Sequence, residues 1–424
     1  MPKMKNSGIG WVGEIPENWK VEKMKYHLQK KKIIPFRHAD EYERMSLTKK
    51  GIVYRDKEEA GGLQPKDFNS YQLVNVNDLV FRLIDLQNVN KGRRVALAKH
   101  KGLMSAAYTV LTSKTINNEF LEYFYLMMDN QRLFNILGSC GVRSSLTADE
   151  LMENNLCFPD KITQMKIVDF LDRTCSEIDT LSADIQSQID VLEEYKKSVI
   201  NEAVTKGLNP DVEMKDSGIE WVGIIPAHWE VHPVYRYFGE RKIKNSALKE
   251  QNLLSLSYGK IVRKDIESLG GLLPASFNTY NIVEAGDIII RPTDLQNDKR
   301  SLRTGLVTEH GIITSAYIDL MPKVGVNSKY FHYLLHSYDV MKVFYNMGNG
   351  VRQGLNYSEF AKLMIFAPSI QEQQEIANYL DKKCAEIEAV IAGKKAQLET
   401  LAEYKKSLIY EYVTGKKEVP NGEF

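Results

Sequence analysis

The chain has 424 residues, of which 43% are hydrophobic, and it carries a formal net charge of +1 at pH 7. That composition supplies enough apolar side chains for two or more domains, each with its own core. No apolar run approaches the roughly 20 residues of a membrane-spanning helix, and the lysine-rich start lacks an apolar signal segment. We therefore expect a cytoplasmic protein with no membrane partner, whose four cysteines are reduced and buried, because none of them forms a Cys-x-x-Cys pair.

The sequence contains one unit twice. The stretch KNSGIGWVGEIPENWKV from Lys5 is matched by KDSGIEWVGIIPAHWEV from Lys215, and these two stretches hold all four tryptophans. Further matches follow in the same order: GGL at 61 and 270, FNSY and FNTY at 68 and 277, DLVFRLIDLQN and DIIIRPTDLQN at 78 and 287, GVR at 141 and 350, and EYKKSVINEAVT and EYKKSLIYEYVT at 194 and 403. A nearly constant offset over the whole chain indicates a tandem duplication. The Asn-Pro pair and polar residues between 208 and 218 predict a linker at the join.

Each copy begins with a mixed α/β domain, which we place at residues 1–160 and 211–369. Short runs between Gly, Asn and Asp clusters predict strands in the first copy: YQLVNV from Tyr71, DLVFRL from Asp78 and YTVLTS from Tyr108. Helices are predicted to start at Asn118 and Ser328, because Asn117 and Asn327 precede them and asparagine caps helices well.

Each copy ends with a long helix, at residues 161–210 and within residues 370–424, which also include a C-terminal tail. Its apolar residues recur at three- and four-residue steps, the spacing of a coiled-coil seam. They are Ile167, Leu171, Cys175, Ile178, Leu181, Ile185, Ile189, Leu192 and Val199 in the first copy, and Ile376, Leu380, Cys384, Ile387, Leu398, Leu401 and Leu408 in the second, where Lys394 interrupts the series. Such a helix cannot bury its stripe alone. We predict that the two helices pair as an antiparallel coiled-coil spacer, which relates the two α/β domains by a pseudo-twofold axis.

These features together resemble the DNA-specificity (S) subunits of type I restriction-modification enzymes. The likeness rests on the alternation of α/β domain and long helix, on the SGIxWVGxIPxxW openings, on APSIQEQQ at the start of the second long helix and on EYKKSLIxExVT near its end. It covers nearly the whole chain. The first long helix departs from the family's pattern, since it begins with FPDKITQMK from Phe158 and not with a Pro-Pro-Leu-x-Glu-Gln-like run.

The resemblance implies a non-catalytic reader of DNA. In that family each α/β domain is a target recognition domain for one half of a bipartite site in double-stranded DNA. The paired helices dock two methyltransferase (M) subunits, which in turn recruit restriction (R) subunits. The alternatives are a self-sufficient DNA-modifying enzyme and a coiled-coil adaptor. The sequence contains neither an Asn/Asp-Pro-Pro-Tyr/Phe-like methyltransferase motif nor a Walker A loop. We therefore expect no catalytic residue, no cofactor and no metal site.

The strongest DNA-binding candidates follow a predicted strand in each copy. Sequence readout needs side chains with two-point hydrogen bonding, and phosphate contacts need basic groups. The blocks RLIDLQNVNKGRR from Arg82 and RPTDLQNDKRSLR from Arg291 contain both kinds. We expect Arg82, Gln87, Asn88, Arg291, Gln296 and Asn297 near bases, and Lys91, Arg93, Arg94, Lys299, Arg300 and Arg303 near phosphates. Alternatively, Arg82 and Arg291 pair internally with Asp85 and Asp294 in a solvated loop.

Other motifs allow two interpretations each. Glycines in SCGVRSS and NGVRQG allow close approach to a phosphate, with Arg143 and Arg352 supplying charge, but a plain hairpin with a solvated arginine is equally compatible. Tyr54, Arg55, Arg263 and Lys264 are weaker candidates. We expect the tryptophans to pack on the domain core, with base stacking by Trp11 or Trp221 as the alternative. The EYKKS stretches either face solvent or contact M subunits.

Overall fold

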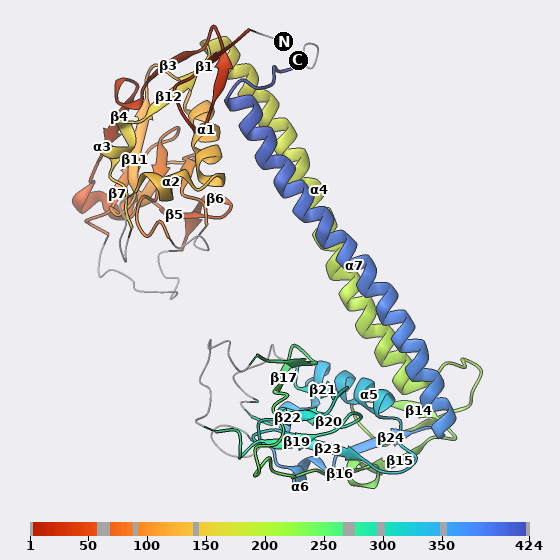
Figure 1. Cartoon of the computed structure of the whole chain (residues 1–424). Helices are drawn as coiled ribbons and strands as arrows, with labels where there is room; N and C mark the ends of the chain where they lie inside the picture. Colours follow the sequence, from red (N-terminus) through yellow and green to blue (C-terminus); the bar gives the residue numbers. More distant parts are fainter. Residues whose placement is uncertain are drawn as a thin grey trace. The chain divides into compact units, whose positions relative to one another are not determined.

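A computed structural model of the chain describes residues 3–56, 68–87, 92–138, 144–265, 276–293, 295, 302–347 and 354–420. The chain divides into two compact units, Met1–Gln186 with Ala396–Phe424, and Ser187–Lys395. This division falls inside both long helices, so each unit holds one α/β domain and one end of each helix (Figure 1).

In unit 1 the domain contains two four-stranded sheets and two short strand pairs. The first sheet has the order β6-β5-β10-β7, with strands at Gly51–Arg55, Arg44–Thr48, Gly102–Met104 and Gln72–Val74. The second has the order β4-β11-β8-β9, with strands at Leu28–Lys31, Thr109–Ser113, Leu79–Phe81 and Val95–Leu97. The pairs join β1 (Met4–Asn6) to β2 (Glu14–Pro16) and β3 (Lys20–Lys23) to β12 (Asn155–Phe158). The helices are α1 (Asn118–Asn130), α2 (Leu133–Leu137) and α3 (Ala148–Met152), with 3-10 turns η1 (Met24–Tyr26) and η2 (Phe36–Glu41).

Unit 2 repeats this order of elements. Its four-stranded sheet has the order β16-β23-β20-β21, with strands at Phe238–Glu240, Ile318–Pro322, Ile288–Ile290 and Thr304–Leu306. The strand pairs are β13 (Met214–Asp216) with β14 (Ile224–Pro226), β15 (Glu230–Pro233) with β24 (Met364–Ala367), β17 (Leu254–Ser257) with β18 (Lys260–Arg263), and β19 (Asn281–Val283) with β22 (Gly311–Ile313). The helices are α5 (Ser328–Val340) and α6 (Tyr357–Phe360), with 3-10 turns η4 (Val234–Arg236) and η5 (Val343–Asn346). The predicted pair of mixed α/β domains is confirmed.

The predicted caps of α1 and α5 are also confirmed. The Asn117 side chain accepts hydrogen bonds from the backbone N–H groups of Glu119 and Phe120. Asn327 does the same for Lys329 and Tyr330. Each cap satisfies N–H groups that the first turn of a helix leaves without an intrahelical partner.

The second tryptophan of each repeated decapeptide packs where a domain meets the long helices. Trp19 and Trp229 are buried, and each makes an edge contact with an aromatic ring of its domain helix, Phe120 or Tyr330, at a centroid distance of 6.4 Å. The Trp229 ring nitrogen also donates to Glu372, near the start of the second long helix, at 3.1 Å. These contacts support the structural interpretation of the tryptophan motifs.

A glycine follows the end of each long helix because the motif leaves no room for a side chain. Gly207 and Gly415 have φ angles of +75° and +69°, the left-handed conformation common just after a helix C-terminus. A Cβ on Gly415 would lie 2.5 Å from Pro16 and 2.9 Å from Trp19, and one on Gly207 would lie 3.3 Å from Trp229. In both units, therefore, the tryptophan motif packs against the end of a long helix.

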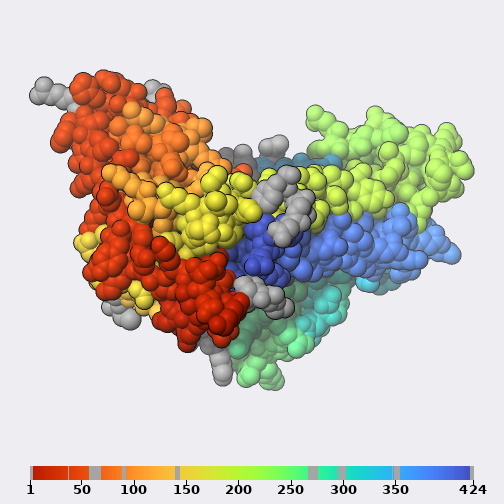
Figure 2. Space-filling model, turned by 90° about the horizontal axis from the view of Figure 1, so that it is seen from above, coloured from red at the N-terminus to blue at the C-terminus, as the bar shows by residue number. Residues whose placement is uncertain are grey.

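The long helices are α4 (Lys161–Lys206) and α7 (Ile370–Val413), and they run antiparallel. In unit 1, Lys405 of α7 contacts Asp179 of α4 at 2.5 Å, and in unit 2, Lys394 donates to Gln188 at 2.5 Å. Figure 2 shows the yellow-green surface of α4 against the blue surface of α7. Cys175 and Cys384 lie buried in the seam, and with Cys157 they are free thiols, as predicted; Cys140 lies outside the described residues.

One predicted seam position is wrong. Leu181 is 48% exposed, and Ser182 turns partly inward instead, where its hydroxyl donates to the Ile178 carbonyl at 2.7 Å. Between Ile178 and Ile185 the residue that faces the other helix is therefore Ser182, four residues after Ile178, and not the apolar Leu181. Lys394 does not interrupt the pairing, because its ammonium group reaches Gln188 across the seam.

A buried glutamine ties each domain to the beginning of a long helix. In unit 1 the Gln164 side chain accepts from the Asn117 N–H at 2.9 Å and donates to the Pro159 carbonyl at 2.8 Å. In unit 2 Gln373 makes the same two bonds, with Asn327 at 2.9 Å and Pro368 at 2.9 Å. The capping residue of the domain helix is thus bonded directly to the long helix.

We predict that Gln164→Ala and Gln373→Ala each lower the free energy of unfolding by about 1–3 kcal/mol, because each leaves a buried N–H and a buried carbonyl without a partner. Chemical denaturation of the full chain measures the loss. Gln371→Ala, on the exposed side of the same helix turn as Gln373, is the control and should change stability by less than about 0.5 kcal/mol. Equal effects of Gln373→Ala and the control would contradict the prediction.

Asp319 is a buried acid in the middle of a sheet. It lies opposite Ile289 in the β20–β23 pair, where unit 1 has Val110 opposite Val80. Neither carboxyl oxygen accepts a hydrogen bond from a described residue, and the nearest cation, the Arg241 Nε, is 4.0 Å away. Burial, reinforced by the charge of Asp287, raises the pKa of Asp319 to about 8. The group is therefore mostly protonated at neutral pH in the folded chain.

This pKa predicts a loss of stability with rising pH. The folded pKa of Asp319 lies above the unfolded value of about 3.9. The contribution of Asp319 to the free energy of unfolding is therefore full below about pH 4 and is lost as the pH rises to about 8. Between these two values it falls by about 1 kcal/mol per pH unit. Urea denaturation at pH 5.5 and pH 8 should show this slope in the wild type. Asp319→Asn and Asp319→Val, the latter copying unit 1, should flatten it; identical slopes in all three proteins would show that the carboxyl ionises freely.

Candidate nucleic-acid interface

The structure describes part of the predicted DNA-reading loops. Between β8 and β9 it describes residues 82–87 and 92–94, and between β20 and β21 it describes residues 291–293, 295 and 302–303. The predicted residues Asn88, Lys91, Arg143, Gln296, Asn297, Lys299, Arg300 and Arg352 lie outside the described residues. We call the segments at 82–94 and 291–303 the DLQN loops, and those at 139–145 and 348–355 the GVR loops.

The two kinds of loop lie side by side at their bases in both units. In unit 1 the Leu86 N–H donates to the Ser144 carbonyl at 3.0 Å and the Leu146 N–H donates to Leu83 at 2.9 Å. In unit 2 the Leu355 N–H donates to the Pro292 carbonyl at 3.0 Å. The described ends of these two segments, about 55 residues apart in sequence, therefore lie side by side in each domain.

The first and last residues of each DLQN loop are paired through the backbone. The Arg82 N–H donates to the Arg94 carbonyl at 2.7 Å, and the Arg291 N–H donates to the Arg303 carbonyl at 2.8 Å. The Arg82 guanidinium is half-buried and donates to the Gly92 carbonyl at 3.1 Å, across the loop, whereas Gln87 is exposed. Each loop therefore begins and ends at one hydrogen-bonded pair of residues, which we call its neck.

Three of the predicted phosphate-binding arginines point inward. Arg94 and Arg303 are only 3% and 0% exposed. Arg93 forms an ion pair with Glu122 of α1 at 2.9 Å, and both side chains are largely covered. These three groups were predicted near phosphates; in the structure Arg94 and Arg303 are buried, and Arg93 is paired with Glu122.

The acids that bind the two buried arginines are at equivalent positions, whereas the carbonyls that accept from their guanidinium groups are not. Arg94 donates its backbone N–H to Asp129 of α1 at 2.9 Å and its guanidinium to the Leu86 carbonyl. Arg303 donates its backbone N–H to Asp339 of α5 and its guanidinium to the Thr293 carbonyl at 2.6 Å. Sequence reasoning missed both aspartates. Their one signal was an acid at the same late position of two otherwise largely apolar helices.

The weaker candidates are on the surface. Tyr54 is 50% exposed and its ring lies 5.2 Å from that of His100. Arg263 is exposed and paired with Glu309. Among the described residues, no group of three or more His, Cys, Asp or Glu side chains could hold a metal ion. None of the described helices is long and apolar enough to cross a membrane.

Comparison with known proteins shows which proteins the chain resembles. Residues 307–400 match the family model of the type I restriction modification DNA specificity domain. Two Methanocaldococcus jannaschii type I restriction enzyme specificity subunits are similar: MjaX at 25% identity over 435 residues (96% of this chain, 95% of the relative), and MjaVIII at 24% over 374 residues (84% and 83%). A chain from the solved structure "Structural basis underlying complex assembly and conformational transition of the type I R-M system" has a TM-score of 0.69 at 13% identity and shares this fold (95% of this chain, 99% of that one). The chain is thus similar to type I specificity subunits over nearly its whole length.

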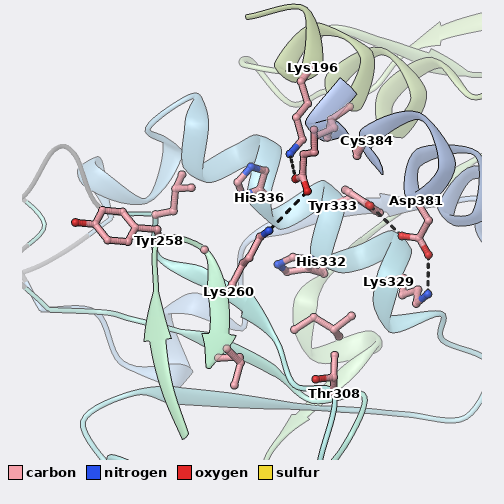
Figure 3. Close-up of a pocket in the computed structure, with 16 residues that line it drawn as sticks. Lys196, Tyr258, Lys260, Thr308, Lys329, His332, Tyr333, His336, Asp381 and Cys384 are labelled. Carbon is pink, nitrogen blue, oxygen red and sulfur yellow. Dashed lines mark hydrogen bonds and ion pairs between the residues drawn. The ribbon is translucent and has the colours of Figure 1, made fainter. Parts of the chain in front are cut away.

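In unit 2 a cavity of about 410 Å³ lies between the β17–β18 hairpin, α5 and the long helices (Figure 3). Its ammonium groups face carboxylates. Lys196 pairs with Glu388, Lys260 lies 3.7 Å from the same carboxylate, and Lys329 pairs with Asp381 at 2.6 Å. The cavity therefore joins domain and helices through matched charges. A cavity of about 500 Å³ in unit 1 is lined by the equivalent elements.

Two histidines of α5 line the unit 2 cavity. Burial, helped by the neighbouring His336, lowers the pKa of His332 to about 3. Burial and the charges of Lys196 and Lys197 lower the pKa of His336 to about 4. Both rings are thus neutral at pH 7, and the ion pairs around them carry the charge of the cavity.

Proposed function

We propose that this specificity subunit directs a type I restriction-modification complex to a bipartite site in double-stranded DNA, and that it contributes no catalytic group. The observation that carries the proposal is the repetition, in two domains, of a closed-neck DLQN loop hydrogen-bonded to a GVR loop. One reader per half-site is what a bipartite target requires. We assign residues 1–160 and 211–369 to the two target recognition domains, and residues 161–210 and 370–424 to the spacer.

Base readout is assigned to residues of the DLQN loops, including the first residue of each neck. We propose that Arg82, Gln87 and Asn88, with Arg291, Gln296 and Asn297, face base edges, and that Lys91, Lys299, Arg300, Arg143 and Arg352 face phosphates. Arginine and glutamine or asparagine offer the two-point bonding that distinguishes guanine and adenine in the major groove. The exposure of Gln87 supports this assignment.

The partners follow from the same proposal. Two methyltransferase subunits dock on the paired helices and bring restriction subunits with them. Tyr195 and Tyr404, at equivalent positions of the EYKKS stretches, are 54% and 52% exposed, and exposed aromatic side chains are enriched at protein interfaces. They are the first residues to test for this contact.

Methylome sequencing of the host, with and without this chain, tests the function. We expect a bipartite methylated motif that disappears with the chain, and two half-sites that resemble each other in inverted orientation, because the loop motifs of both domains match. Purified chain incubated with DNA, Mg²⁺ and labelled adenosylmethionine is the control. Methylation or cleavage without a partner would favour a self-sufficient enzyme, and an unchanged methylome would favour an adaptor.

Arg82→Ala and Arg291→Ala should each remove about 1–3 kcal/mol of discrimination at one half-site, because each removes a candidate bidentate contact to guanine. Lys91→Ala, within the same loop as Arg82, is the matched control: it should weaken binding to all sequences alike and lower the salt dependence. Binding of duplexes with single base-pair changes measures both effects. A uniform loss in the arginine variants would assign these groups to phosphates or to the neck.

A further inference from the structure

We propose that Arg94 with Asp129, and Arg303 with Asp339, are positioning residues that hold each DLQN loop in the conformation that reads its half-site. The inference rests on the proposed function and assigns these four residues a role in specificity without DNA contact. Because the two pairs belong to different units, each is expected to act on one half-site.

The bonding of each arginine spans the neck of its loop. In unit 1 the backbone N–H of Arg94 is held by Asp129 at 2.9 Å, with the Nε 3.7 Å from the same carboxylate, while the far end of the side chain donates to the Leu86 carbonyl. Arg94 therefore joins the part of the loop that follows β8, the part that precedes β9, and the domain helix α1. We call this arrangement the neck clamp.

Unit 2 contains the same arginine and aspartate, but the arginine bonds a different carbonyl of the loop. Arg303 donates to the Thr293 carbonyl at 2.6 Å, and its backbone N–H is held by Asp339. The neighbouring group differs: Asn135 donates to the Leu86 carbonyl at 2.6 Å in unit 1, whereas in unit 2 the Arg303 guanidinium lies 5.0 Å from the Tyr345 ring. The arginine and aspartate are thus the shared part of the clamp, and the third group is not.

Burial excludes a phosphate role for these arginines in the observed conformation. The side chains are 3% and 0% exposed, so a phosphate contact would first break the bonds to the loop carbonyls. Burying a charged group is costly unless it is paired and hydrogen-bonded. Asp339 is buried and Asp129 is partly buried, and burial raises the pKa of Asp339 to about 6. Burying these groups costs folding free energy. In return they fix the neck, next to which the residues proposed to contact bases lie.

A fixed neck raises specificity through preorganisation. A loop that is already ordered loses less conformational entropy when it binds, so more of the base-contact energy appears as affinity for the correct sequence. Loosening the neck should lower binding to the correct half-site more than binding to unrelated DNA. The number of phosphates contacted does not change, so the salt dependence of binding should not change either.

Arg94→Lys and Arg303→Lys separate this role from phosphate contact. Lysine keeps the charge but lacks the planar fork that spans the neck. In the complex with its methyltransferase subunits, on duplexes carrying the methylated site or single base-pair changes of it, we expect each variant to lose about tenfold discrimination at one half-site only. The slope of log affinity against log salt should equal that of the wild type. Asp129→Asn and Asp339→Asn, which keep an acceptor for the arginine N–H, should give a smaller loss at the same half-sites.

Several outcomes would overturn the clamp. The clamp would be contradicted if both lysine variants discriminated between sequences as well as the wild type. It would also be contradicted if the slope of log affinity against log salt were smaller by about 0.9, the change expected for the loss of one phosphate contact. Equal loss at both half-sites, or failure of both the lysine and asparagine variants to fold, would mean that the pair supports the domain and not the loop. If the wild-type complex methylates no bipartite site, the proposed function fails, whereas variants that match a specific wild type overturn the clamp alone.

Discussion

Each long helix depends on the other to bury its apolar stripe. An isolated amphipathic helix leaves that stripe in water, and most helical stability in proteins comes from tertiary packing. The burial does not stop at the helix pair. In unit 1 one continuous core includes Leu171 of α4, Val413 of α7 and Trp19 of the domain, and in unit 2 a second core includes Val204, Leu380 and Trp229. Each domain is therefore built onto the helix pair and shares its core.

Polar side chains at the seam make this pairing specific. Lys405 meets Asp179 in unit 1, and Lys394 meets Gln188 in unit 2. Shifting one helix by a heptad would separate both of these pairs. Polar residues in a coiled-coil seam fix register at a cost in stability. Since the buried glutamines tie the domains to the same helices, the register of the seam also determines where each domain is attached.

Periodic and local features of this chain could be predicted from its sequence, and long-range polar contacts could not. The repeat, the long helices and the asparagine caps follow from spacing and from groups within a few residues of one another. Leu181 was wrongly predicted in the seam, because Leu181 and Ser182 both lie three or four residues from Ile178 and Ile185. The burial of Arg94 could not be predicted for a different reason. Whether an arginine in a basic loop faces water or the core depends on Asp129, 35 residues away, and nothing local marks that acid as its partner.

The differences between the units show which parts of the duplicated fold are free to change. In unit 1 Arg93 pairs with Glu122 beside the cavity; the equivalent residues in unit 2 are Leu302 and His332, which both line the unit 2 cavity. The two partners have changed together, and the low pKa of His332 keeps that ring neutral. Replacing one partner alone would have left a charge without its counterion in a largely covered site, at a cost of several kcal/mol. The neck clamp shows the opposite behaviour, since its arginine and aspartate are the same in both units. The arginine and aspartate at the base of each DLQN loop are thus common to both units, whereas the side chains that line the cavities differ.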